Sequence, residues 1–474
     1  MAVMRLTRPT CGMPHRYVRR LYISVVIPKM EYGLVVWYQP VRVREDGRRK
    51  GSVGVAKRLE RVQRMAVRLI TGGFRTTATD TMEFHAFVAP VILRLNRTAL
   101  FNALRLASLP PSHPLHKPVR WCSTHYVQRH RTPLHELFNA FPSAQKVECI
   151  DPTPSRLTWE PRFTWSIAAS KEDAAREAGK WGPDVLVVYS DGSGYEGGVG
   201  AAATTVWRGE SLTRRVHLGA IAEHTVFEAE VVGVLLALDL ARCTKRARRV
   251  VVLLDNQACI RALTKNRPQP AMYLLNEFHR LLDRLLRARP RLQGNIHLAW
   301  VPGHSEIEGN ELADEAAKEA AKGKTDDVPV RGSKIPWADL PVSVAAQRAV
   351  GTKFMASEWM SWWKESSRAV KLAPIDKSPP SRRILRLYDK LSRAETSILT
   401  QLRTGHCSLN AFLHRIKVAD SPLCARYLTA RHTLRRSLKS NSPFNLSSLL
   451  SHPKNLPHTL QYIKTTQRFP LYFP

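Results

Sequence analysis

The sequence predicts an α/β fold: a mixed five-stranded sheet with packed helices, flanked by mainly helical basic regions. Two segments rich in Val and Leu, 185–191 and 249–255, have the length and composition of buried strands, and each ends on an aspartate. A long apolar segment of helical length separates them, so the two strands are expected to be parallel neighbours joined by a helical crossover. The charge is distributed unevenly. Residues 184–322 contain 18 Lys and Arg against 17 Asp and Glu, a net of about +1, whereas the whole chain has a net charge of +34.

The elements of residues 184–323 follow in order from the first strand. That strand, 185–191, ends at an aspartate and is followed by the glycine-rich turn "GSGYEGG". The segments "VGAAATTVW" and "LTRRVHLG" predict two further strands of an antiparallel meander. Apolar periodicity predicts the remaining elements. They are a helix over 224–243, a strand over 249–255, helices over 256–263 and 271–289, a strand over 295–301 and a last helix that begins near Gly309.

The first region, residues 1–108, is expected to be helical with basic faces. In "RLERVQRMAVRLITGGFRTT" the apolar residues have helical spacing, and arginines stand between them. These apolar residues are Leu59, Val62, Ala66, Val67 and Ile70. A solvated helix with an apolar stripe explains this periodicity, but it does not explain why acidic residues are nearly absent from the face.

Composition divides the rest of the chain. We expect a Pro-rich linker with a few short elements over 109–183, a second linker over 324–340 and a helical C-terminal region over 341–420. Asp420 is the last acidic residue. The 54 residues that follow carry eight Lys and Arg and no apolar periodicity, so residues 421–474 are expected to be disordered.

The net charge predicts the kind of partner. With 73 Lys and Arg against 39 Asp and Glu, a polyanion is expected, nucleic acid first and an anionic membrane second. No segment has the composition of a membrane span, because "LYISVVIPKMEYGLVVWY" is interrupted by Lys29 and Glu31 and is interpreted as buried core. Seven scattered cysteines without a CxxC pair indicate a reducing compartment. An intracellular protein of the nucleus or cytoplasm is therefore expected, not a secreted or membrane protein, and the oligomeric state is left open.

Carboxylates are expected to gather at one edge of the sheet. Asp191 and Asp255 follow parallel strands, the helix between them carries Glu228 and Glu230, and the last helix supplies Asp314. Carboxylates that crowd together repel, and their ionised forms need cations between them. Oxygen ligands suit Mg²⁺, and two such ions activate a water and stabilise the leaving oxygen of a phosphodiester. Each residue alone also has an ordinary interpretation as a turn, cap or solvated helix residue.

Four motifs carry a resemblance. "YSDGSG", "TVFEAEVVGVLLAL", "LLDNQACIRAL" and "WVPGHSEIEGNELAD" are similar in order and spacing to a type 1 ribonuclease H domain. The resemblance implies an RNase H-like fold and a two-Mg²⁺ endoribonuclease that cleaves the RNA strand of RNA–DNA hybrids, with Mn²⁺ as an alternative ion. It implies that the metal ligands are Asp191, Glu230, Asp255 and Asp314. The spacing to the helical "AL" selects Glu230, and Glu228 is expected to face solvent.

The same resemblance implies further site residues. His304 would relay a proton to or from the attacking water or the leaving group. Four polar residues would contact the hybrid: Gln257 and Asn310, and with a weaker signal Ser193 and Asn256. An arginine series at near-helical spacing either tracks phosphates or forms a solvated face: Arg280, Arg284, Arg287 and Arg291.

The flanks are similar to a narrower family. "IPKMEYGLVVWY", "LRLASLPPSHPLHKP" and "LTQLRTGHCSLNAFLHRI" resemble parts of non-LTR retrotransposon polyproteins, and no paired-aspartate polymerase motif is present. The chain is therefore expected to be a C-terminal fragment that lacks the polymerase palm. The resemblance also places a zinc knuckle at "SPLC". Tyr427 stands where its second Cys is expected, and His432 alone does not complete a site after Cys424, so zinc is unlikely. The alternative to an active nuclease is a catalytically silent nucleic-acid-binding relic.

Overall fold

The computed structural model forms two compact units, Leu100–Gly351 and Met1–Ala99 with Thr352–Pro474. We call the first the sheet unit and the second the helical unit. The structure describes residues 6–125, 127, 129, 131–151, 160–265, 267–303, 307–326, 330–423, 446–465, 469 and 472. Among these residues, none of the helices combines the length and the apolar character that a membrane crossing needs.

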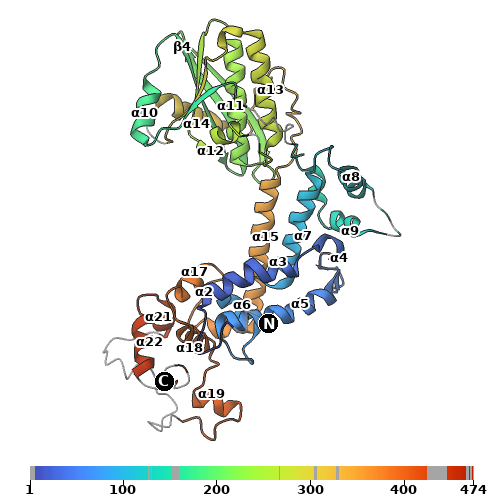
Figure 1. Ribbon diagram of the computed structural model, residues 1–474, viewed down its shortest axis with the longest axis vertical. Helices are drawn as coiled ribbons and strands as arrows, with labels where there is room; N and C mark the ends of the chain where they lie inside the picture. The colour runs from blue at the N-terminus through green and yellow to red at the C-terminus, as the bar shows by residue number, and fades with distance from the viewer. Residues whose placement is uncertain are drawn as a thin grey trace. The chain divides into compact units, whose positions relative to one another are not determined.

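The sheet unit is built on a six-stranded mixed sheet with the strand order β3-β8-β7-β4-β5-β6 (Figure 1). The first four strands in this order are parallel, and β4, β5 and β6 form the antiparallel meander. The strands are β3 (Thr164–Ser166), β4 (Val185–Tyr195), β5 (Gly198–Trp207), β6 (Glu210–Ala220), β7 (Arg249–Leu254) and β8 (Ile296–Trp300). The predicted α/β class, meander and parallel pair are confirmed.

The predicted number of strands is wrong by one. The additional strand β3 pairs in parallel with β8 at the edge of the sheet, with Trp165 opposite Leu298. It lies in the 109–183 segment that was expected to be a linker. Its three residues, Thr-Trp-Ser, have neither the apolar run nor the alternation that identifies a strand, and the pairing with β8 joins residues more than 130 positions apart.

Helices cover both faces of the sheet. They are α11 (Val226–Cys243), α12 (Gln257–Leu263), α13 (Met272–Ala288) and α14 (Glu308–Ala321), close to the four predicted helices. The period of two in β4 separates the faces, because Leu186 and Val188 pack with α11 in the main core while Val187 and Tyr189 belong to a second cluster. On the meander, Ala202 packs against the α14 alanines. The long helix α11 is buried on nearly every side, as its apolar sequence requires.

The two expected linkers contain short helices and buried residues. Residues 109–183 also contain α8 (His116–Thr124), α9 (Pro133–Ala140) and α10 (Lys171–Gly179). In 324–340, Val330, Ile335 and Leu340 are buried in the main core of the sheet unit. Their irregular spacing follows neither a helix nor a strand, so the sequence pattern does not mark them as core residues.

The helical unit is mainly helical, as expected. Its N-terminal elements are α2 (His15–Leu21), the π-helix Tyr22–Val26, α3 (Ile27–Met30), α4 (Leu34–Trp37), the strand pair β1 (Arg42–Val43) and β2 (Arg49–Lys50), α5 (Val53–Thr71) and α6 (Thr79–Ala86). The helices α7 (Val91–Ala107) and α15 (Val344–Glu365) contain the positions where the chain passes from one unit to the other. The later helices are α16 (Ser367–Leu372), α17 (Arg383–Tyr388), α18 (Arg393–Thr404), α19 (Asn410–Arg415), α21 (Leu446–Ser451) and α22 (Leu456–Thr465).

Two expectations for the helical unit need correction. Residues 421–474 were expected to be disordered, and 424–445 among them lie outside the described part of the chain. In α22, however, Leu456, Leu460 and Ile463 are buried at helical spacing in a core cluster. Three apolar residues at helical spacing hardly change the composition of a 54-residue segment, so composition alone does not predict this helix. The segment around the π-helix was interpreted as buried core, but Val25 and Val36 are exposed. Its short helical pieces bury few positions each, so its apolar residues do not all face inward.

Candidate metal centre and active site

Strand pairing brings the two predicted aspartates to one edge of the sheet. The parallel pairing of β4 with β7 ends at Ser190 opposite Leu254, and Asp191 and Asp255 are the next residues in each strand direction. The expectation that the first strand ends at Asp191 is wrong, because β4 continues to pair with β5 as far as Tyr195. The shared register, and not a shared strand end, places the two carboxylates together.

The helix α11 brings Glu230 to the same edge. It approaches β4 at Gly192, where a Cβ atom would lie 2.3 Å from the Glu230 amide nitrogen, so only glycine permits this close approach. The helix begins with a capping box: the Thr225 hydroxyl accepts a hydrogen bond from the Glu228 amide, and the Glu228 carboxylate accepts one from the Thr225 amide. Glu228 is therefore buried, at 1% exposure, and the expectation that it faces solvent is wrong. The motif T-x-x-E in "TVFE" was the signal for this role.

Three of the predicted ligands form a compact cluster. One carboxylate oxygen from each of Asp191, Glu230 and Asp255 lies within 4.8 Å of the others. Burial, then the charges of Asp255 and Asp314, raises the pKa of Asp191 to about 7. Burial and the two aspartates raise the pKa of Glu230 well above its usual value. The three acids therefore repel each other in the absence of a cation.

The donor set of this cluster fits a divalent metal ion. The Asn256 side-chain amide donates a hydrogen bond to one Glu230 oxygen at 3.3 Å. The other oxygen, Oε2, is buried and accepts no hydrogen bond from any residue that the structure describes. A glutamate with one buried, donor-free oxygen, clustered with two further carboxylates, suits a hard cation. We refer to Asp191, Glu230 and Asp255 as the carboxylate triad.

Asp314 lies close to the triad but does not belong to it. It projects from α14, and its charge is one cause of the raised pKa of Asp191. Its carboxylate accepts a hydrogen bond from the ammonium group of Lys318 at 2.6 Å, one helical turn later. The sequence reasoning missed Lys318, although its i+4 spacing from Asp314 was the available signal.

The predicted nucleic-acid contacts have different surroundings. Asn256 is the N-cap of α12, where its side-chain oxygen accepts hydrogen bonds from the amides of the second and third residues that follow. Gln257 is half-buried and accepts a hydrogen bond from Arg261 at 2.9 Å. Ser193 is half-buried on β4. Asn310 is buried on α14, and its Oδ1 is without a donor among the described residues.

His304 lies outside the described residues. The preceding residue, Gly303, is in contact with the site, because a Cβ atom there would lie 2.8 Å from Asp255 Oδ2. The chain therefore passes Asp255 directly before His304. The expected zinc-knuckle positions Cys424, Tyr427 and His432 also lie outside the described residues.

Comparison with known proteins gives a family match over the segment that holds this site. Residues 183–322 match the family model described as RNase H. The Pol polyproteins of Equine infectious anemia virus, strain Wyoming and isolate 1369, are each 27% identical over 165 residues, which are 34% of this chain and 13% of each polyprotein. The aligned segment thus spans about an eighth of the viral relatives.

Solved structures give similar matches. The N-terminal RNase H domain of rv2228c from Mycobacterium tuberculosis is 20% identical and covers 29% of this chain and 94% of that chain, with a TM-score of 0.23. RNase H1 from Halobacterium salinarum is 19% identical and covers 30% of this chain and 99% of that chain, also with a TM-score of 0.23. The family match, over the segment that holds the carboxylate triad, identifies residues 183–322 as a ribonuclease H domain, a domain of the hydrolase class, in a chain with similarity to retroviral Pol polyproteins.

Proposed function

We propose that this chain cleaves the RNA strand of RNA–DNA hybrids by metal-dependent hydrolysis of the phosphodiester bond. The observation that carries the proposal is the buried carboxylate triad, which lies within the segment that matches RNase H. A buried cluster of repelling carboxylates destabilises a fold unless a cation or a proton neutralises it, so its presence is best explained by a bound ion.

Two Mg²⁺ ions would be held by the triad and by Asp314, with Mn²⁺ as the alternative because both ions prefer oxygen ligands. When bound, such ions lower the pKa of a water and neutralise the charge that develops on the phosphate. The chain itself orients the ligands. Asn256 fixes one oxygen of Glu230, and Lys318 fixes the Asp314 carboxylate. His304 is proposed to move the proton between water and leaving group.

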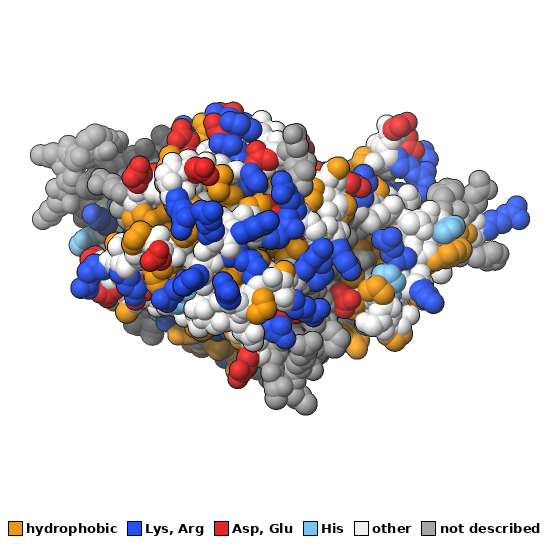
Figure 2. Space-filling model, turned by 90° about the horizontal axis from the view of Figure 1, so that it is seen from above, with side chains coloured by type: hydrophobic (Ala, Val, Ile, Leu, Met, Phe, Trp, Pro, Cys, Tyr) orange, Lys and Arg blue, Asp and Glu red, His pale blue; other side chains and the backbone are white. Residues whose placement is uncertain are grey.

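The surface of the chain suits a nucleic-acid substrate. Figure 2 shows Lys and Arg side chains gathered on one face, with fewer Asp and Glu among them. We propose that Gln257, Asn310 and Ser193 contact the hybrid next to the triad, while Asn256 acts mainly through Glu230. One solved relative, LC11-RNase H1, was determined in complex with an RNA/DNA hybrid.

Two of the arginines of α13, Arg280 and Arg284, have structural roles. Arg280 pairs with Glu277 at 2.6 Å, and both Arg280 and Arg284 donate to the carbonyl oxygen of Gly332. They hold the 330–340 segment on the sheet unit, so we do not assign them to the substrate.

We further propose that the chain derives from a non-LTR retrotransposon polyprotein. The support is the set of flanking motifs and the similarity to Pol polyproteins. Zinc is not part of the proposed function.

The test uses the full chain with an end-labelled RNA–DNA hybrid, in Mg²⁺ and in EDTA. Asp255→Asn removes one triad carboxylate, and Asp184→Asn, an exposed aspartate directly before β4, is the matched control. RNA cleavage that needs metal, persists in Asp184→Asn and is lost in Asp255→Asn is expected. A folded wild-type chain that binds the hybrid but does not cut it in Mg²⁺ or Mn²⁺ would show that the protein is a silent relic.

A further inference from the structure

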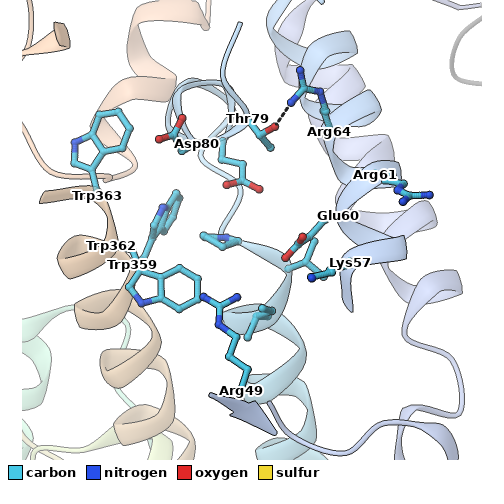
Figure 3. A pocket seen from close by; sticks show the side chains of 14 residues that line it. Arg49, Lys57, Glu60, Arg61, Arg64, Thr79, Asp80, Trp359, Trp362 and Trp363 are labelled. Carbon is cyan, nitrogen blue, oxygen red and sulfur yellow. Dashed lines mark hydrogen bonds between the residues drawn. The ribbon is translucent and has the colours of Figure 1, made fainter. Parts of the chain in front are cut away.

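A cavity of about 660 Å³ lies within the helical unit. Figure 3 shows its walls: three tryptophans of α15 on one side, basic side chains of α5 on the other, and Thr79 and Asp80 of α6 between them. Its volume falls in the range of pockets that hold small ligands or single nucleotides. The ribonuclease H domain lies in the other unit and does not account for this cavity.

The aromatic wall is held by packing. Trp359 and Trp363 are four residues apart in α15 and both are buried. Trp359 stacks on Phe87 with ring centroids 5.3 Å apart, and Trp363 stacks on Phe84 at 4.8 Å. Trp362, next to them, stays half-buried and lines the cavity, so it presents a supported indole ring to a ligand.

The opposite wall is basic. Lys57, Arg61 and Arg64 are spaced by four and three residues on α5, and all three are exposed and line the cavity. Arg49 from β2 also lines it, with its guanidinium 5.8 Å from the centre of a Trp362 ring. Within the part of the chain that the structure describes, none of these four cations forms a salt bridge. Arg64 is oriented by hydrogen bonds to the Thr79 hydroxyl and the Arg75 carbonyl.

Acidic residues reduce this charge only in part. Burial raises the pKa of Glu83 to about 8, against the effect of a hydrogen bond from Gln63, so this carboxyl is mostly neutral at pH 7. Asp80 accepts hydrogen bonds from the Ser366 hydroxyl and from a backbone amide. By formal charges, four cations and the carboxylates of Glu60 and Asp80 give +2 around the cavity. The residues assigned to the helical unit contain 40 Lys and Arg against 12 Asp and Glu, which is +28 of the total of +34.

We propose that this cavity is a binding site for single-stranded nucleic acid, in which one unstacked base packs on Trp362 and the neighbouring phosphates contact Arg61 and Arg64. Aromatic stacking combined with a basic groove is the common chemistry of single-strand recognition, because every base has a π face and every nucleotide a phosphate. The bases of a duplex are stacked on each other and do not reach Trp362.

A single strand of nucleic acid fits this cavity better than a free nucleotide does. The basic series of α5 continues to Arg68, and Lys57 and Arg68 are about 16 Å apart along the helix axis at 1.5 Å per residue. That length exceeds one nucleotide. The site therefore gives the chain a place for a single strand in a unit separate from the ribonuclease H domain.

The experiment measures binding of a fluorescent 12-nucleotide oligothymidylate by anisotropy, with the full chain in EDTA. Trp362→Ala is expected to weaken binding about tenfold, within the range for loss of one stacked base. Trp362→Phe should keep most of the affinity, because it preserves an aromatic face. An abasic 12-mer should bind wild type and Trp362→Ala within about twofold, since it has no base to stack.

A charge variant tests the opposite wall. Arg61→Gln should weaken binding of both 12-mers and lower the slope of log affinity against log salt by about 0.7, the value for one phosphate contact of a single strand. Arg58→Gln, an exposed arginine of α5 that does not line the cavity, is the matched control and should change affinity less than twofold. Three results would each overturn the proposal. Trp362→Ala could lose as much affinity for the abasic 12-mer as for oligothymidylate, or Arg58→Gln could lower the affinity as much as Arg61→Gln does. Thymidine monophosphate could also bind as tightly as the 12-mer.

Discussion

The ribonuclease H domain and the helical unit differ in net charge and in where their charged side chains gather. The domain is almost neutral overall, but it concentrates negative charge in a buried triad. The helical unit carries +28 and spreads positive charge around an open, aromatic cavity. A metal-dependent nuclease needs both, because carboxylates that bind cations repel the polyanionic substrate. Under the proposed functions, attraction of nucleic acid and chemistry on it are divided between these two regions of the chain.

Glu230→Gln should give the largest loss of hybrid cleavage, and it should leave single-strand binding by the helical unit unchanged. We expect hybrid cleavage to fall by at least about 100-fold, because a triad ligand loses its charge. The melting temperature in EDTA should rise by a few degrees, since the ionised form of this buried carboxyl destabilises the fold. Cleavage assays and thermal unfolding measure both quantities. Oligothymidylate binding should not change. A variant that cleaves normally would remove Glu230 from the proposed metal site.

Glu83→Gln tests whether a buried carboxyl with a raised pKa also destabilises the helical unit. Its pKa is raised from 4.5 to about 8, so the folded state binds this proton more tightly than the unfolded chain. The stabilising contribution is fully present below pH 4.5 and is lost as the pH rises to about 8. We expect the glutamine variant to recover on the order of 1–3 kcal/mol of unfolding free energy at pH 8.5. Denaturant unfolding at pH 5 and pH 8.5 measures this.

The exposed Glu45→Gln is the matched control for that experiment, and its pH dependence should follow wild type. A Glu83→Gln profile that declines with pH as steeply as the wild-type profile would contradict the assigned cause.

Gln257→Ala should have a moderate effect on substrate binding alone. We expect the KM for hybrid to rise about three- to fivefold with little change in kcat, because one uncharged contact contributes about 1 kcal/mol. Steady-state kinetics on a labelled hybrid measures both constants. If kcat falls and KM stays constant, Gln257 acts on the site through α12 and does not contact the substrate.

Lys318→Gln should have the smallest effect on hybrid cleavage, seen only in its Mg²⁺ requirement. Besides orienting the Asp314 carboxylate, the Lys318 ammonium group holds the oxygen that a metal ion would bind. We expect competition to outweigh orientation, so removal of Lys318 should lower the Mg²⁺ concentration at half-maximal activity about two- to threefold. A Mg²⁺ titration of cleavage measures it, with Lys322→Gln, an exposed lysine just beyond α14, as the control. A higher Mg²⁺ requirement in Lys318→Gln would indicate that orienting Asp314 matters more than competing for it.

The two regions also differ in how far the sequence predicts them. In the ribonuclease H domain the period of two in β4 and the helical length of α11 are local signals, so Asp191 and Asp255 are placed by pattern alone. The edge strand β3 escapes prediction because its pairing with β8 is distant in sequence and its residues are not apolar. The role of Glu228 was missed although its capping motif is local.

In the helical unit the cavity depends on tertiary contact. The tryptophans of α15 and the basic residues of α5 are each visible in the sequence, but about 300 positions separate Arg61 from Trp362. No periodicity or motif spacing joins segments so far apart. Phe84 and Phe87 pack α6 against α15, and the cavity lining then joins the tryptophans to the basic residues of α5.

The capping box at the start of α11 makes the position of Glu230 sensitive to insertions and deletions. Thr225 and Glu228 fix the first turn, and each residue of a helix advances the side-chain direction by about 100°. One codon added between Glu228 and Glu230 would turn the third carboxylate of the triad away from Asp191. The capping box and the apolar composition of the helix would both be unchanged, so neither feature would signal that the proposed metal ligand is lost.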